Sequence, residues 1–190
     1  KESEGPLFYD STKNLRAFID NLHKNGIWVI ARVVVFCDSS LVQSNPELYI
    51  RSSSTGALWT DNGKRYWFDP QSPEVQQYIV NFSKKVIDWG FDEIQFDYVR
   101  FPTDGNMEDT VYPVFTGEKK KYEVIGDFFD KLSGDLRAYK PDIILSVDLF
   151  GYVASTFNSL AIGQRLMDCA DVFDYISFMI YPSHFSDGFY

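Results

Sequence analysis

The chain has 190 residues and is 45% hydrophobic, which provides enough apolar side chains for one packed core. Its formal net charge of −9 argues against a nucleic-acid partner, because phosphate binding needs clustered Lys and Arg side chains. Two Cys and two His are too few for a disulfide framework or a His-rich metal centre, so we expect no metal and no cofactor. No stretch approaches the roughly 20 apolar residues of a membrane span.

The predicted elements alternate between helix and strand along the chain. Apolar residues at helical spacing over 15–22 precede a run at 28–36 that is rich in Val and Ile, which predicts a buried strand. A second helix begins at the N-cap Ser72, with proline at its first position, and ends at Gly90. The elements that follow are a strand over 91–101, a helix over 122–136, a strand over 142–151, a weaker helix over 157–167 and a strand over 174–182.

This order predicts a parallel sheet covered by helices, either a barrel or an open sheet. Alternate residues of a strand point to opposite sides, and in all four strands one side carries the polar residues while the other is almost wholly apolar. An open sheet with helices on both faces is hydrophobic on both, so we favour a barrel, whose interior near the mouth can be polar. The side with the polar residues holds Arg32, Val34, Phe36 and Asp38, then Glu93, Gln95 and Asp97, then Ser146 and Asp148, and then Ser177, Met179 and Tyr181.

Four strands cannot close a barrel, and a complete (β/α)8 barrel takes about 250 residues. We therefore expect residues 1–190 to form a single partial domain that holds the middle strands of a longer TIM-type barrel. The chain starts abruptly, either after a removed leader or after further domain sequence, so its compartment is left open by the residues alone.

Two carboxylates are the main catalytic candidates. The active site of such a barrel gathers at the C-terminal ends of the strands, where Asp97 and Asp148 share the inward side at comparable depth on consecutive strands. We expect their side chains to approach within roughly 5 to 9 Å, the separations that retaining and inverting glycosidases use. One carboxylate would stabilise the oxocarbenium-like transition state while the other protonates the leaving oxygen. The structural alternative is that both carboxylates cap strand ends or pair with arginines.

A second set of side chains near the strand ends is predicted to bind substrate. The long loop over 39–70 carries aromatic rings that would lie over the barrel mouth, where a ring can stack on a sugar, although packing within the loop is the alternative. A histidine after the last strand can donate a proton or bind a hydroxyl, or it can be structural. The set consists of Asp38, Arg32, Arg100, Trp59, Trp67, Tyr181 and His184.

Five segments resemble one protein family in the same order. GFDEIQFDYVRFP at 90–102 closely resembles the signature of a bacterial family of glycosyl-hydrolase-like domains that was long a domain of unknown function. The resemblance implies a TIM-type barrel related to glycoside hydrolases, with the strands seen here being the third to sixth of eight. The other matching segments are IARVVVFCD at 30–38, YWFDPQSPEV at 66–75, SVDLFG at 146–151 and DYISFMIYPSHF at 174–185.

The same resemblance implies roles for two residues. In the related α-glucosidase and α-galactosidase barrels, a carboxylate that ends the fourth strand is the nucleophile, and Asp97 matches that position. The acid/base residue of those enzymes comes from the fifth or the sixth strand, so Asp148 is the candidate, while the sixth strand ends with Tyr181 and His184.

Three functions follow as alternatives. The leading hypothesis is an O-glycosyl hydrolase or transglycosylase that acts on a bacterial or dietary polysaccharide, a substrate that favours the cell envelope or the exterior. The second is a non-catalytic glycan-binding or cell-envelope scaffold domain, favoured by a separation of the two carboxyl groups beyond about 10 Å with no third carboxylate in the cleft. The third is a fragment that is inactive alone, because missing barrel strands expose the sheet edges. The oligomeric state is left open.

Overall fold

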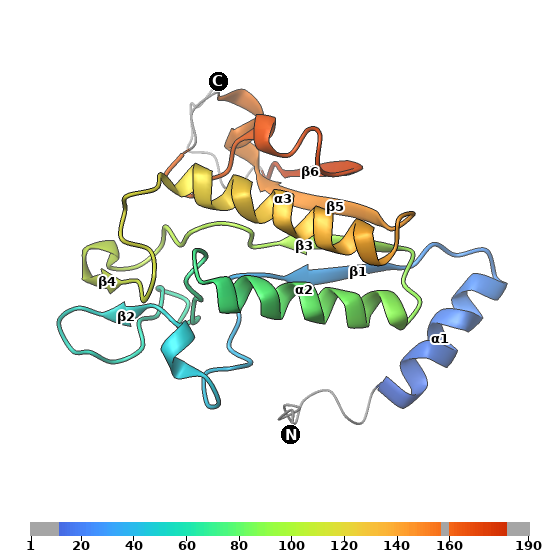
Figure 1. The fold of residues 1–190 in the computed structure, drawn as a ribbon, viewed down its shortest axis with the longest axis horizontal. Coiled ribbons are helices and arrows are strands. Elements are labelled where there is room, and N and C mark those ends of the chain that lie inside the picture. Colours follow the sequence, from blue (N-terminus) through green and yellow to red (C-terminus); the bar gives the residue numbers. More distant parts are fainter. Residues whose placement is uncertain (1–11, 157–159, 182–190) are drawn as a thin grey trace.

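The computed structural model describes residues 12–156 and 160–181. Four parallel strands form its central sheet (Figure 1). They are β1 (Ile30–Val34), β3 (Glu93–Asp97), β5 (Ile144–Phe150) and β6 (Tyr175–Met179), in the spatial order β1-β3-β5-β6. Neighbours in the sheet therefore follow the order of the chain, and the prediction of parallel strands in these four segments is confirmed.

Three α-helices accompany the sheet: α1 (Thr12–Lys24), α2 (Pro73–Asp88) and α3 (Lys121–Tyr139). Helix α2 begins as predicted, because the side chain of Ser72 accepts a hydrogen bond of 3.3 Å from the backbone N–H of Val75. Helices α2 and α3 lie side by side over one face of the sheet, and α1 lies beyond the N-terminal end of β1 (Figure 1). None of these helices is long and apolar enough to cross a membrane.

The two faces of the sheet differ as the alternation predicts. In β1, Ala31 and Val33 are buried whereas Arg32 between them is exposed. The buried side packs against the apolar stripes of α2 and α3, through residues such as Ile79 and Phe128. The polar side chains of the four strands consequently lie on the face opposite to these helices.

The long loop after β1 joins with the loop after β3. It contains a 3-10 helix, η1 (Pro46–Leu48), and a short strand, β2 (Arg51–Ser52), which pairs antiparallel with β4 (Thr110–Val111). A second 3-10 helix, η2 (Met107–Asp109), precedes β4. The buried carboxylate of Asp69 holds the two loops together, because its Oδ2 accepts hydrogen bonds from the backbone N–H groups of Val114 and Phe115. The segment over 39–70, predicted as one long loop, thus packs with the loop after β3 beside the ends of β1 and β3. We call these two loops, with β2 and β4, the cap.

The prediction of a helix over 157–167 is wrong for residues 160–167. Residues 157–159 lie outside the part of the chain that the structure describes. Two 3-10 helices, η3 (Gly151–Ser155) and η4 (Leu166–Asp168), flank a turn instead. Gly163 has φ +83°, a left-handed conformation that breaks a helix. Gln164 is fully buried and its side chain bonds the backbone of β5 and of the loop after β3, so tertiary hydrogen bonds replace helical ones.

Both outer strands have one open side. Within the described residues, β1 pairs with β3 alone and β6 with β5 alone. Large apolar side chains near these edges are exposed, namely Trp28, Ile30, Tyr175 and Ile180. Among the described residues, no further strand pairs with β1 or β6 to close a barrel, as expected for a part of one.

Candidate active site

Asp97, the last residue of β3, lies on the polar face of the sheet. Its Oδ2 forms an ion pair with Nη2 of Arg32 on the neighbouring strand β1. Its Oδ1 accepts a hydrogen bond of 2.6 Å from the backbone N–H of Tyr98. The residue is only 4% exposed. One guanidinium and one backbone donor therefore hold the carboxylate in a single orientation.

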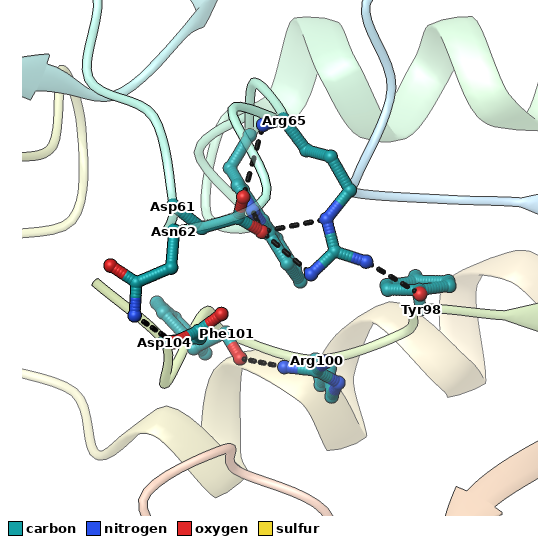
Figure 2. Close-up of polar contacts among 8 residues, drawn as sticks. Asp61, Asn62, Arg65, Tyr98, Arg100, Phe101 and Asp104 are labelled. Atoms are coloured by element: carbon teal, nitrogen blue, oxygen red, sulfur yellow. Dashed lines mark hydrogen bonds and ion pairs between the residues drawn. The ribbon is translucent and has the colours of Figure 1, made fainter.

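Tyr98 turns the chain sharply just after this carboxylate. Its φ of 56° is left-handed, which is rare and strained for a bulky residue and requires support from its surroundings. The support comes from Arg65, whose Nη1 donates to the Tyr98 hydroxyl at 2.8 Å, and from Trp67, whose ring meets that of Tyr98 edge to face. Figure 2 shows Arg65 in turn held by Asp61. The cap thus fixes the backbone that positions Asp97.

Asp148 lies on the next strand, β5, and is 8% exposed. The register of β3 and β5 pairs Gln95 with Ser146 and Phe96 with Val147, and its extension by one residue brings Asp148 level with Asp97. Neighbouring strands lie about 4.8 Å apart, so the two carboxylates leave the sheet side by side.

The pKa of Asp148 is raised from 3.8 to about 6. Burial is the largest cause, followed by the negative charge of Asp97, whereas Arg32 and a hydrogen bond from Gln95 oppose the shift. Nε2 of Gln95 donates that bond to Oδ1 of Asp148 at 2.8 Å. With its pKa at about 6, Asp148 is therefore still partly protonated at pH values where an ordinary carboxyl group is fully ionised.

A pocket of about 230 Å³ opens at these strand ends. It contains four of the predicted site residues together with three that the sequence did not single out. Asp148 is not part of its wall. Phe150, which follows two residues later on the same side of β5, does line the pocket. Asp148 therefore lies one layer deeper than the pocket surface. The lining residues are Arg32, Asp97, Tyr98, Arg100, Phe150, Met179 and Tyr181.

Arg100 contributes a half-buried guanidinium to the pocket wall. The cation lies over two aromatic rings, 5.0 Å from the centroid of Trp67 and 5.3 Å from that of Tyr98. Its Nη1 donates to the backbone carbonyl of Phe101 at 3.1 Å (Figure 2). Burial lowers the pKa of Arg100 below its usual value, although a guanidinium stays charged at any physiological pH.

Three of the predicted substrate-binding residues have other surroundings. Oδ1 of Asp38 accepts a hydrogen bond from the backbone N–H of Ser40, which forms a turn after β1 outside the pocket wall. Trp59 and Trp67 are 3% and 1% exposed, so their rings pack inside the cap and neither face is open to a sugar. His184 lies outside the described residues.

The residues of the site that sequence reasoning did not select are Gln95, Tyr98, Phe150 and Met179, although Met179 was placed on the polar side of its strand. Phe150 continues the inward alternation of Ser146 and Asp148, and Gln95 was recognised as inward-facing, so strand parity contained the signal for both. Tyr98 faces away by parity, yet it lines the pocket, and its backbone there is left-handed. No group of three or more His, Cys, Asp or Glu side chains that could hold a metal ion occurs in the described part of the chain.

Solved glycoside hydrolases share this architecture. The α-galactosidase from Thermus thermophilus in complex with stachyose is 14% identical and matches over 85% of this chain and 30% of its own, with a TM-score of 0.55. The glycoside hydrolase domain of PelA from Pseudomonas aeruginosa is 12% identical over 86% of this chain and 55% of its own, with a TM-score of 0.54. The chain therefore has the TIM-barrel-like fold of glycoside hydrolases, of which it holds four parallel strands, and the predicted fold is confirmed.

Sequence similarity identifies the family. A crystal structure of a hypothetical protein from Ruminiclostridium thermocellum is 36% identical over 71% of this chain and 65% of its own, with a TM-score of 0.60. The family described as "Putative glycosyl hydrolase domain" matches residues 5–190, and the chain belongs to this family. The chain spans less than two thirds of the length of each of these three structures. No curated protein matches it.

Proposed function

We propose that the full-length protein hydrolyses an O-glycosidic bond of an oligo- or polysaccharide, with Asp97 as the nucleophile and Asp148 as the acid/base catalyst. The observation that carries the proposal is the neighbouring position of these two carboxylates at the strand ends, where the pKa of Asp148 is raised to about 6. Two carboxyl groups with different proton affinities are what glycosidic cleavage requires.

In the first step a carboxylate oxygen of Asp97 attacks the anomeric carbon. The bond between that carbon and the leaving oxygen breaks, and Asp148 transfers its proton to the leaving oxygen. Arg32 and the Tyr98 N–H each occupy one lone pair of the Asp97 carboxylate, which leaves further lone pairs for the attack. The products of this step are the shortened glycan and a glycosyl ester of Asp97.

In the second step Asp148, now ionised, takes a proton from a water molecule that attacks the anomeric carbon. The ester bond breaks, the carboxylate of Asp97 is regenerated and the configuration of the sugar is retained. Adjacent strands about 4.8 Å apart support this double displacement, because retaining enzymes hold their two carboxyl groups roughly 5 to 5.5 Å apart.

The test is turnover of a panel of aryl α- and β-glycosides and oligosaccharides by the full-length protein and by its Asp97→Asn variant. We expect the substitution to lower kcat by about 10³-fold or more, since a neutral amide cannot form the ester. Asp92→Asn is the matched control, because Asp92 lies at the other end of β3, where it accepts a 2.7 Å bond from the backbone N–H of Val29. Equal activity of the Asp97 variant and the wild type would refute the proposal.

One observation favours a second function, a glycan-binding domain without catalysis. Asp148 does not reach the wall of the pocket that Asp97 lines. A sugar bound there would meet Asp97, Arg32 and the ring of Tyr181 without contact to a proton donor on β5. Glycan binding by the full-length protein without turnover of any substrate would make this function the better one.

A further inference from the structure

Arg100 has no carboxylate partner among the described residues, unlike the two neighbouring arginines Arg32 and Arg65. Arg32 is paired with Asp97 and Arg65 with Asp61, whereas Arg100 forms no ion pair with any described residue. Figure 2 shows the contrast, since Arg65 reaches a carboxylate and a hydroxyl while Arg100 reaches a backbone carbonyl. The pocket therefore contains one guanidinium without a counter-ion among the described residues.

Burying the charged guanidinium of Arg100 away from water costs free energy. Burial removes water from it, which is the main cause of its lowered pKa. The cation of Arg65 adds to the lowering, whereas Tyr98, Cys37 and Asp97 oppose it. The rings of Trp67 and Tyr98 and the single hydrogen bond to Phe101 compensate only in part. A negatively charged ligand group would compensate for the lost water more fully.

The arrangement also suits the geometry of an anion. A guanidinium has five N–H donors, and only Nη1 of Arg100 has a partner within the described part of the chain. Its planar fork matches a carboxylate or a sulfate through two parallel hydrogen bonds. Contacts with both aromatic rings limit its rotation, so the fork is held in position before a ligand arrives.

Arg100 lines the same pocket as the nucleophile candidate Asp97, three residues earlier in the chain. Asp97 forms its ion pair with Arg32, so among the described residues that line the pocket Arg100 is the arginine without an ion-pair partner. From these observations we infer that the protein takes an acidic glycan, whose carboxylate or sulfate group binds Arg100 while the sugar ring lies at Asp97. This inference rests on the proposed function and adds the class of its substrate.

The experiment measures binding and turnover by the full-length protein on matched glycans that are neutral, carry a carboxylate, or carry a sulfate. We expect an acidic member to bind at least about 10-fold more tightly than its neutral counterpart, as a charge-assisted bidentate contact allows. The comparison of the carboxylated with the sulfated member identifies which oxyanion the site prefers. Arg100→Gln should abolish the difference between acidic and neutral members.

Two further variants separate recognition from folding. Arg100→Lys keeps a charge without the fork, so it should fold like the wild type and lose most of the preference. Arg16→Gln removes an exposed arginine of α1 that bonds the backbone carbonyl of Asp88, and the preference should survive it. Equal binding of neutral and acidic glycans, or a preference that persists in both Arg100 variants, would overturn the acidic substrate and leave the hydrolase proposal intact. Failure to bind or cleave any glycan would overturn both.

Discussion

Asp148 lies level with Asp97 on the neighbouring strand, and the negative charge of Asp97 is, after burial, the largest cause of its raised pKa. The backbone register creates this relationship, because parallel pairing of β3 with β5 brings the two residues to the same height. Two carboxylates this close cannot both ionise freely, and one of them keeps its proton up to a pH of about 6.

The first prediction concerns the pH dependence of catalysis. The acid/base residue must be protonated for the first step, so kcat/KM should fall as pH rises through about 6, the pKa of Asp148. Measuring kcat/KM from pH 4 to 8 tests this. Asp148→Asn should lower turnover of alkyl glycosides by about 10² to 10⁴-fold and affect dinitrophenyl glycosides much less, since their leaving group needs no proton. Equal losses on both substrates would contradict the role of Asp148.

A second prediction concerns stability at the same residue. The pKa of Asp148 is about 6 in the folded protein and 3.8 as the ordinary value, so the folded state binds this proton more tightly than the unfolded one. The contribution of Asp148 to the free energy of unfolding is therefore fully present below pH 4. It is lost as pH rises through 6, and the loss amounts to roughly 2–3 kcal/mol.

Asparagine at this position keeps the acceptor for Gln95 and removes the charge. We expect Asp148→Asn to raise the free energy of unfolding at pH 7.5 by roughly 2–3 kcal/mol and to leave it unchanged at pH 4. Urea denaturation at the two pH values measures the difference. A gain of the same size at both pH values would mean that titration of Asp148 is not the cause.

The third prediction identifies Gln95 as a positioning residue. Its hydrogen bond to Oδ1 favours the ionised form of Asp148 and fixes the side chain, so Gln95→Ala should raise the pKa of Asp148 further. The fall of kcat/KM should then move to higher pH, with kcat reduced and KM nearly unchanged. Gln95→Asn, which keeps an amide donor, is the conservative comparison. An unmoved pH profile in the alanine variant would exclude this role.

The fourth prediction concerns Asp69 within the YWFDPQSPEV segment. This carboxylate is fully buried, and its oxygens accept backbone hydrogen bonds from Gln71 at 2.9 Å, Val114 at 2.6 Å and Phe115 at 2.8 Å. Asp69→Ala would leave these donors without a partner, so we expect a loss of about 3 kcal/mol in thermal or urea denaturation.

Asp109 provides the matched control for this experiment. It also accepts a backbone hydrogen bond, from Ser54 at 2.8 Å, but solvent can reach its partners once the side chain is removed. Asp109→Ala should therefore destabilise the protein much less than Asp69→Ala. Similar losses in the two variants would show that burial of the donors is not what makes Asp69 important.

The residues alone predicted the strands that bear the site, and the helix before β3 began at the predicted cap Ser72. These features are local, because periodicity, capping and strand parity act over a few neighbouring residues. Parity also indicated which side of β3 and β5 would carry Asp97 and Asp148. The helix expected over 157–167 failed since the buried side chain of Gln164 binds distant backbone, which no local pattern records.

Other parts of the site depended on contacts between distant segments. Trp67 is an aromatic residue of the kind that stacks on sugars, yet its ring is buried between two loops. There it packs against the guanidinium of Arg100 and the ring of Tyr98. The left-handed turn at Tyr98 is supported by the hydrogen bond from Arg65, which comes from a distant loop. The sequence by itself determined the order of the four sheet strands and of the three α-helices, the polar face and the family. The tertiary structure decided which polar groups are paired, how deep each lies and how Asp148 titrates, because desolvation and charge proximity depend on the packing of segments that are far apart in the chain.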